Sequence, residues 1–195
     1  YGKQPEIARW NLARLAETLL PLLHEDRNIA IDLANEGLGT FEERFRGYWL
    51  AGMRAKLGIF TAEKEDATLV QSLLDWMEKH RMDFTNTFHA LGDLSGPTFP
   101  DAEFLQWHER WTARLARQPQ SPADVAESMR AHNAAVIPRN RKVEEALAAA
   151  SDHGDLRVME RLLTALANPF ATDPPSEFTS PAPPGSQPYQ TFCGT

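Results

Sequence analysis

The side chains best suited to bind a metal ion are the six histidines: His24, His80, His89, His108, His132 and His153. Two histidines that share a zinc ion on one helix stand three to five residues apart, and no pair in this sequence does so. Solvated or helix-capping histidines are therefore the default interpretation, and we predict no metal site in the chain.

Two clusters of charge admit a chemical and a structural interpretation. Glu63-Lys64-Glu65-Asp66 could be a group of catalytic carboxylates, but acidic residues are favoured in the first turn of any helix by its macrodipole. Arg139-Asn140-Arg141-Lys142 could hold a phosphate, or could form a solvated loop-to-helix junction in which Asn140 is the N-cap. We prefer the structural interpretation in both cases.

Aromatic and glycine patterns give equally little sign of a ligand. The five tryptophans could line a pocket, although their helical spacing to other apolar residues favours core packing; they are Trp10, Trp49, Trp76, Trp107 and Trp111. Gly37-Leu38-Gly39 lacks the preceding strand and the following Lys-Ser/Thr of a phosphate-binding loop.

Cys193, the only cysteine, is the one position at which a chemical role competes with a structural one. A buried cysteine is usually an inert small hydrophobe. This one follows a proline-rich stretch near the end of the chain, where an accessible thiol could form a reversible disulfide with a cysteine elsewhere. No second cysteine is present in the chain to serve as that partner.

Composition limits the remaining classes of function. The chain has 195 residues, of which 42% are hydrophobic and 24% charged, as in ordinary globular proteins. Its net charge of −7 disfavours nucleic acid or an anionic membrane as the main partner. A single cysteine excludes an internal disulfide framework. No apolar run approaches the ~20 residues of a membrane span, and we expect no signal peptide. The chain opens on Tyr1 rather than Met, so we expect it to be incomplete.

The elements that would position these residues are all helical. Pro5 opens a first helix that should turn Ile7, Trp10, Leu12, Leu15 and Leu19 toward a core, with a stop or kink at Pro21. Gly37 and Gly39 indicate a break in the helical pattern after it. A second stripe has intervals of four and ends at Gly58; its residues are Phe41, Phe45, Trp49, Met53 and Leu57.

The pattern continues to residue 168. Thr61 is expected to cap a helix that buries Leu69, Val70, Leu73, Leu74 and Met77. A short helix carries Phe84, Phe88 and Leu91, residues 92–100 form a loop, and a further helix carries Phe104, Trp107, Trp111 and Leu115. Ser121-Pro122 is a helix start, Val143 to Ala150 form an alanine-rich helix, and a last helix follows Gly154-Asp155 with Leu156, Met159, Leu162, Leu163 and Leu166.

The final 27 residues differ, because they hold 7 of the 14 prolines. Such a segment favours extended backbone and is not expected to form a core of its own. We find no period-2 strand run and no internal repeat. The predicted fold is therefore all-α with a proline-rich tail.

Several of these stretches together resemble the C-terminal part of the selenoprotein O family of kinase-like protein adenylyltransferases. Residues 4–16 are similar to its QPxIAxWNLxRLA segment, and Met53 to Gly58, Glu65-Asp66 and Leu73-Leu74 to its MRxKLG…ED…LL stretch. Further similarities lie in order along the chain. Asp83 to Phe88 resemble the family's D-Y/F-T-x-x-F motif, and Ile137 to Ala146 resemble its IPRNHxVExA motif. Gly154-Asp155, Leu162-Leu163 and Asn168-Pro169-Phe170 are similar to its GD…LL…NP-Y/F pattern, and the terminal Phe192-Cys193-Gly194-Thr195 to its bacterial end, where cysteine stands in for selenocysteine.

The resemblance has departures and one large gap. Arg141 stands where the family commonly has His, and Ala134 stands where an Asn-Pro pair usually follows Asn133, so we assign no specific role to that loop. The family's glycine-rich region, nucleotide-binding Lys and Glu, catalytic Asp, Mg²⁺-binding Asn and DFG-like Asp all precede the first matching segment. None of them can be placed on this chain.

The resemblance implies the following expectations. Residues 1–60 would belong to a kinase-like C-lobe, 61–168 to a helical C-terminal extension and 169–195 to the tail. The full-length bacterial, cytoplasmic enzyme would transfer AMP from ATP, with Mg²⁺ or Mn²⁺, to Ser, Thr or Tyr hydroxyls of protein substrates. This segment alone would bind neither cofactor and would pack on the N-terminal kinase-like portion. Cys193 would be the redox residue, paired with a cysteine upstream of Tyr1.

The rival hypothesis is a stand-alone helical protein-interaction module without catalysis. Its support is the acidic, helical composition and the scarcity of catalytic motifs. A metal-dependent enzyme within this segment alone is a third possibility, but no ligand spacing predicts it.

Overall fold

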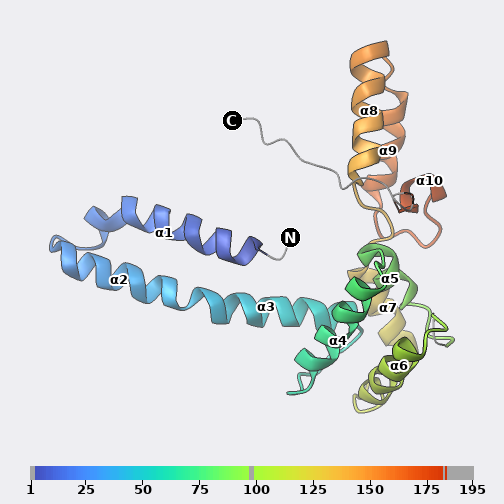
Figure 1. Ribbon diagram of the computed structural model, residues 1–195, viewed down its shortest axis with the longest axis horizontal. Helices are drawn as coiled ribbons and strands as arrows, with labels where there is room; N and C mark the ends of the chain where they lie inside the picture. Colours follow the sequence, from blue (N-terminus) through green and yellow to red (C-terminus); the bar gives the residue numbers. More distant parts are fainter. Residues whose placement is uncertain (1–2, 97–98, 182, 184–195) are drawn as a thin grey trace. The chain divides into compact units, whose positions relative to one another are not determined.

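The computed structural model describes residues 3–96, 99–181 and 183, and these residues form helices without any strand (Figure 1). The prediction of an all-α fold is confirmed. The helices are α1 Gln4–Leu23, α2 Arg27–Gly39, α3 Phe41–Lys56, α4 Asp66–Lys79, α5 Phe84–Ala90, α6 Ala102–Leu115, α7 Pro122–His132, α8 Asn140–His153, α9 Arg157–Ala167 and α10 Ser176–Thr179. None of them is both long and apolar enough to cross a membrane.

The chain divides into two compact units, residues 1–53 and residues 54–195. The first unit contains α1, α2 and α3 as far as Met53, with α1 packed along α2. Helix α1 begins at Gln4, one residue before the predicted start at Pro5, and continues through Pro21 to Leu23, so its end falls two residues after the expected stop or kink. Sequence reasoning missed α2, whose first turn is capped by the Asp26 carboxylate accepting from the Asn28 and Ile29 amides.

The first unit buries little of its apolar surface. Helix α1 has no buried residue, and the side chains predicted to face a core are exposed, including Trp10 at 60% and Leu15 at 53%. The stripe on α3 behaves similarly, because Phe45 and Trp49 are exposed whereas Met53 is buried. The predicted helices are present, but the predicted burial of their apolar faces is wrong for this unit.

The second unit buries many more of its apolar side chains than the first. It buries apolar side chains from the end of α3 through α7: Leu57, Val70, Leu73, Trp76, Phe88, Leu91, Phe104, Trp107, Trp111 and Met129. The indole N–H groups of Trp107 and Trp111 donate to the carbonyls of Leu69 (2.9 Å) and Leu57 (3.0 Å), so both large rings are buried without an unsatisfied donor.

Local signals at helix ends are confirmed in part. Gly58 follows α3 in the left-handed region (φ 67°), and a Cβ there would lie 2.5 Å from Val125 Cγ1. Ser121 caps α7 in a capping box with Asp124. Thr61 does not cap α4, which begins at Asp66 after Glu65. Asn140 is the first residue of α8 rather than its N-cap, a position that Arg139 occupies.

Helices α8 and α9 pack on one another beside a smaller core. That core contains Val136, Ala146, Leu162 and Phe178. Phe178 lies on α10, within the segment expected to remain extended, so this part of the tail contributes to a core and the prediction is corrected there. The Pro169 carbonyl accepts from the amides of Ala135 (2.7 Å) and Val136 (3.2 Å) and joins the chain before α8 to the chain after α9.

Candidate functional site

Among the residues that the structure describes, the most enclosed charged group is Asp66, in the first turn of α4. Its carboxylate is fully buried and accepts from Arg114 Nε (2.7 Å), Arg54 Nε (2.6 Å) and the Glu63 amide (2.9 Å). Burial alone raises the pKa of the Asp66 carboxyl, but the hydrogen bonds from Arg114, Glu63 and Arg54 outweigh it and hold that pKa below its usual value. Asp66 is therefore an ionised anchor between three segments of the chain.

Glu63 and two arginines extend this cluster. The buried Arg114 guanidinium also donates to the Thr61 carbonyl (2.6 Å) and lies 3.2 Å from Glu63 Oε1, while Arg117 pairs with Glu63 Oε2 at 2.6 Å. The sequence alone favours the interpretation of the acidic run as a response to the helix macrodipole. That interpretation is incomplete, because two of the carboxylates are paired with arginines about 50 residues later in the chain.

The basic run after Pro138 is also engaged in pairing. Arg139 donates to both carboxylate oxygens of Asp83 (2.7 and 3.0 Å) and to Asn86 Oδ1 (3.0 Å). Arg141 and Lys142 both pair with Glu145 on their own helix. The prediction of a solvated cationic face is therefore wrong for Arg139. The three cations of the run are paired with two carboxylates, since Arg141 and Lys142 share Glu145, and this pairing weakens the case for a phosphate site.

Asp83 fixes the start of α5 as well as the Arg139 side chain. It accepts from the Asn86 amide (2.8 Å), and Asn86 Nδ2 in turn donates to the Thr179 carbonyl of α10 (3.1 Å). Burial raises the pKa of Asp83, but the hydrogen bond from Arg139 and those from nearby amides lower it by more.

Lys56 ties the end of α3 to the end of α7. Its Nζ donates to the His132 carbonyl (3.0 Å) and lies over the rings of Phe84 (5.7 Å) and Phe88 (5.6 Å). Burial lowers the pKa of the Lys56 ammonium. In return, Asn133 Nδ2 donates to the Lys56 carbonyl at 2.8 Å.

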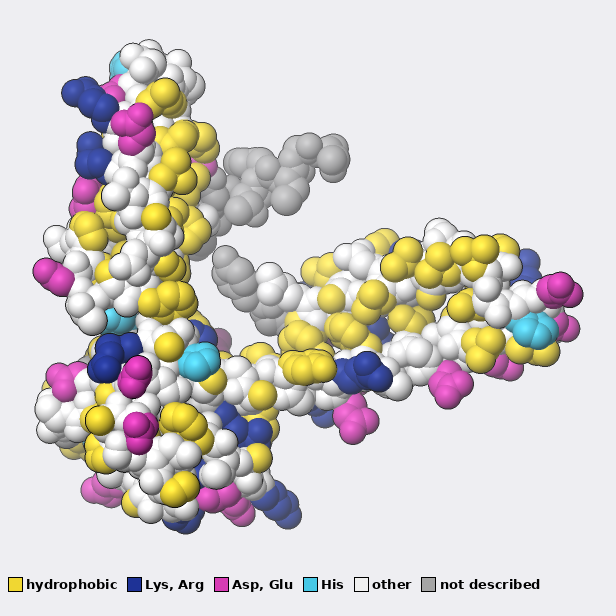
Figure 2. All heavy atoms as spheres, turned by 180° about the vertical axis from the view of Figure 1, so that it is seen from behind, with side chains coloured by type: hydrophobic (Ala, Val, Ile, Leu, Met, Phe, Trp, Pro, Cys, Tyr) yellow, Lys and Arg dark blue, Asp and Glu magenta, His cyan; other side chains and the backbone are white. Residues whose placement is uncertain are grey.

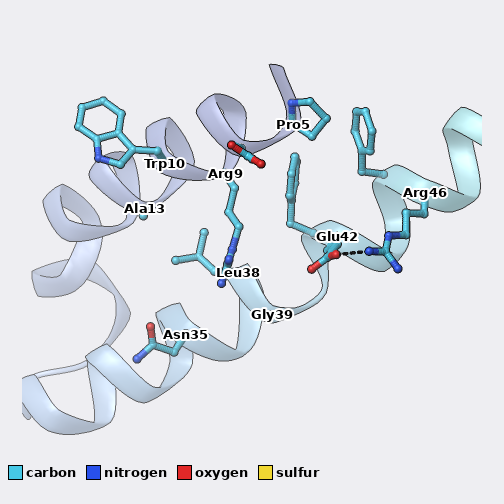
Figure 3. Close-up of a pocket in the computed structure, with 12 residues that line it drawn as sticks. Pro5, Arg9, Trp10, Ala13, Asn35, Leu38, Gly39, Glu42 and Arg46 are labelled. Atoms are coloured by element: carbon cyan, nitrogen blue, oxygen red, sulfur yellow. Dashed lines mark hydrogen bonds and ion pairs between the residues drawn. The ribbon is translucent and has the colours of Figure 1, made fainter. Parts of the chain in front are cut away.

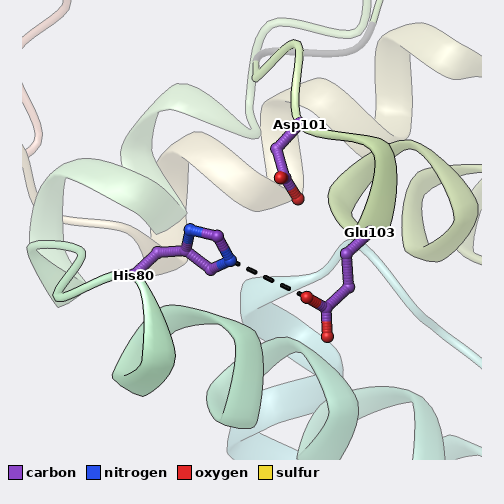
Figure 4. A group of neighbouring side chains, drawn as sticks. All are labelled: His80, Asp101 and Glu103. Atoms are coloured by element: carbon purple, nitrogen blue, oxygen red, sulfur yellow. Dashed lines mark ion pairs between the residues drawn. The ribbon is translucent and has the colours of Figure 1, made fainter.

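Among the described residues, one group has the composition of a metal site: His80, Asp101 and Glu103 (Figure 4). One oxygen of each carboxylate already has a partner. Lys79 Nζ lies 2.6 Å from Glu103 Oε2, and Asp101 Oδ1 accepts from the Trp76 indole and the Phe104 amide. His80 Nε2 is 3.7 Å from Glu103. The Lys79 ammonium lies at hydrogen-bond distance from a Glu103 oxygen and would repel a metal cation bound there. Mg²⁺ also prefers six oxygen ligands in an octahedron, and His80 supplies a nitrogen. These residues therefore fit an ion-pair cluster and not a Mg²⁺ site.

The tryptophans divide between the two interpretations offered for them. Trp76, Trp107 and Trp111 are core residues, as predicted. Trp10 and Trp49 are exposed and line hollows of the first unit. Figure 3 shows the hollow beside Trp10, where Arg9 extends from α1 toward Leu38 on α2 and Glu42 pairs with Arg46 on α3.

The remaining site prediction falls on Cys193, which lies outside the described residues. Its redox role stays a prediction. The sequence does not reveal the pairs made by Arg54, Arg114 and Asp101, because their partners lie 12, 48 and 25 residues away and no local spacing indicates such contacts.

The residues that carry the family resemblance contact one another. Arg54 of the MRxKLG-like stretch binds Asp66 of the Glu-Asp pair, and Asp83 of the D-F-T motif binds Arg139 of the IPRN motif. Asn168-Pro169 supplies the carbonyl that receives the amides before α8. In this part of the chain these motif residues join helices together.

Comparison with known proteins agrees with that pattern of residues. The family model "Protein adenylyltransferase SelO" matches residues 1–167. The whole chain is 51% identical to a "Protein nucleotidyltransferase YdiU" of Brevibacillus brevis, 52% to one of Halalkalibacterium halodurans and 45% to one of Bacillus mycoides. The chain spans about 40% of the length of these relatives. A stand-alone interaction module is not favoured by these matches.

Proposed function

This chain belongs to the SelO family of protein adenylyltransferases, and on that premise we propose that it is the helical C-terminal part of an enzyme that transfers AMP to protein hydroxyl groups. The observation that carries the proposal is the family match over residues 1–167, together with about 50% identity along the whole chain. The substrates are Ser, Thr or Tyr side chains of other proteins.

The reaction defines what the rest of the polypeptide must supply. The acceptor hydroxyl oxygen forms a bond to the α-phosphorus of ATP, the bond from that phosphorus to the bridging oxygen breaks, and pyrophosphate leaves while a carboxylate takes the hydroxyl proton. Bound Mg²⁺ or Mn²⁺ would neutralise phosphate charge. We assign the nucleotide-binding, metal-binding and catalytic residues to the part of the enzyme that precedes Tyr1.

The contacts of the described residues support a structural role for this part of the enzyme. The most buried carboxylates, Asp66 and Asp83, are both ionised and bonded to arginines, and the cluster at His80 contains an ammonium. Such groups are suited to hold helices in place. We propose that residues 1–60 belong to a kinase-like C-lobe, 61–168 to a helical extension and 169–195 to a tail.

We further propose that Cys193 regulates the enzyme through a disulfide with a cysteine of the preceding part. Two thiols would lose two protons and two electrons to a peroxide, which is reduced to water. Oxidised full-length protein should then migrate differently from its Cys193→Ser variant on a non-reducing gel. Identical migration of the two with and without peroxide would remove this part of the proposal.

The enzyme is expected to act in the bacterial cytoplasm on protein substrates, with neither nucleic acid nor membrane as a partner. The net charge of −7 on these 195 residues supports only the part of the expectation that concerns nucleic acid and anionic membranes.

The test of the proposed function begins with the coding sequence upstream of Tyr1. The longer product should transfer labelled AMP from α-labelled ATP to protein, with Mg²⁺ or Mn²⁺, and the 195-residue chain should neither bind ATP nor transfer AMP. ATP labelled at the γ-phosphate is the control, because it reports phosphoryl transfer. A reading frame that begins at Tyr1, or a longer product that transfers only γ-phosphate, would refute the proposal.

A further inference from the structure

The first unit carries a groove whose walls are apolar side chains at helical spacing. On α1 they are Leu12, Leu15, Leu19 and Leu23, at intervals of three and four, and on α2 the wall includes Leu33. On α3 they are Phe45, Tyr48 and Trp49. These side chains define the α1–α3 groove, which encloses about 780 Å³.

The groove is open and its apolar walls are accessible. Leu15 is 53% exposed, Leu33 44% and Trp49 38%. Figure 2 shows hydrophobic side chains spread along the α1–α3 unit. A contiguous apolar surface of this kind on a soluble protein marks a place where another surface packs. The second unit, by contrast, buries Trp76, Trp107 and Trp111 together with Phe88 and Phe104, although Phe60, Phe84 and Phe170 are exposed.

The chemistry of the walls indicates what kind of occupant fits. Among the groove's residues only Thr40, Arg44 and Tyr48 have polar side chains. Small-molecule sites combine apolar walls with several convergent polar groups that fix the ligand's orientation, and this groove offers few. A row of aliphatic and aromatic side chains along two or three helices instead matches the apolar face of further polypeptide.

The length of the relatives points to the source of that polypeptide. The 200 aligned residues make up 40% of the Brevibacillus brevis protein, so about 300 of its residues lie outside the match. Residues that precede Tyr1 would be covalently joined to α1, which forms one wall of the groove, and a tethered segment has a far higher effective concentration than a second molecule.

We propose that the α1–α3 groove binds the polypeptide that precedes Tyr1 in the longer enzyme. That polypeptide packs its own apolar side chains between Leu15 and Leu33. This inference rests on the proposed function insofar as that function requires a longer chain. The inference adds to that function the surface through which the preceding polypeptide packs on the first unit.

The test measures thiol labelling in the longer polypeptide, with each introduced cysteine read from its own peptide by mass spectrometry. Leu15→Cys and Leu33→Cys place a thiol in the groove, and Glu36→Cys places one on an exposed position of the same unit outside it. Each rate is divided by the rate for the same protein unfolded in guanidinium, which corrects for local reactivity.

We expect both groove thiols to react at least about tenfold more slowly in the native than in the unfolded protein, while the Glu36→Cys thiol reacts at nearly the same rate in both. Protection should not change when the protein is diluted. Equal labelling of the Leu33→Cys and Glu36→Cys thiols would overturn the proposal even if Leu15→Cys did not fold. Protection that disappears on dilution would also overturn it, because the occupant would then be a second copy.

The AMP-transfer assay on the same proteins separates this inference from the proposed function. Protected groove thiols without AMP transfer would refute the function and leave the groove's occupant supported. AMP transfer with freely labelled groove thiols would do the reverse.

Discussion

Trp49 and Trp111 belong to similar sequence patterns in the two units, yet their surroundings differ. Trp49 follows Phe41 and Phe45 at intervals of four on α3, and Trp111 follows Phe104 and Trp107 at intervals of three and four on α6. Trp49 is 38% exposed, whereas Trp111 is 2% exposed and donates its indole N–H to Leu57. Periodicity thus identifies an apolar helix face, but it does not reveal which segment covers that face.

The ion pairs of the two units differ in the same way. The pairs Arg14–Glu17 and Arg46–Glu42 in the first unit are exposed and join residues of one helix. In the second unit, Asp66 and Asp83 bind arginines from distant segments and are largely buried. Asp66 and Asp83 therefore fix the tertiary arrangement of the second unit, although its Arg141–Glu145 pair stays within one helix, while these two pairs of the first unit support single helices.

The largest loss of stability should come from Asp66→Ala. It leaves the buried Arg114 and the half-buried Arg54 without their carboxylate, at an expected cost of about 3–5 kcal/mol in the free energy of unfolding. Glu42→Ala, which breaks the exposed pair on α3, should cost less than about 0.5 kcal/mol. Urea titrations followed by circular dichroism measure both, and similar midpoints would contradict the contrast between the units.

The two tryptophans provide the next test. Trp111→Ala should lower the free energy of unfolding by about 3–4 kcal/mol through cavity formation and the loss of packing. Trp49→Ala in the 195-residue chain should cost only about 1 kcal/mol, because that ring already contacts water. In the longer polypeptide the cost of Trp49→Ala should rise, and a Trp49→Ala cost unchanged by the preceding residues would weaken the case for a covered groove.

Two glycines with positive φ test how closely the second unit is packed. Gly58→Ala should cost about 2–4 kcal/mol, since left-handed strain adds to a clash of the new Cβ with Val125. Gly154→Ala has the same strain but no atom within 4 Å of the new Cβ, and should cost about 1 kcal/mol. Thermal denaturation of the two variants compares these costs, and equal shifts in Tm would show that Val125 and Met129 move aside.

The smallest effect concerns pH and the pair between Asp83 and Arg139. The folded-state pKa of Asp83 lies below its unfolded value, so the unfolded chain binds more protons in acid. The pair's contribution, about 1–2 kcal/mol, is present above about pH 4 and is lost as pH falls through the folded pKa. Arg139→Gln should make the free energy of unfolding less dependent on pH between about 5 and 3, while Asp66 acts equally in both proteins. An unchanged pH slope would contradict this assignment.

Much of the secondary structure could be predicted from local signals. Gly58 indicates where α3 ends, and Ser121-Pro122 indicates where α7 begins. The spacing of Leu69, Val70 and Leu73 predicts the buried face of α4. Helix α2 was missed, and its start is set by the Asp26 side chain. The tail prediction failed at Phe178, because a short helix between prolines can bury one large ring in a neighbouring core.

The candidate sites were less predictable, since their partners lie far apart in sequence. The role of Asp66 depends on Arg114, and that of Arg139 depends on Asp83, 56 residues earlier. The sequence by itself determined the helical class, many helix boundaries and the family resemblance, because caps, glycines and apolar spacing act over a few residues. Only the tertiary structure decided which faces are covered and which charges meet, since burial and ion pairing depend on what a distant segment brings to the same place.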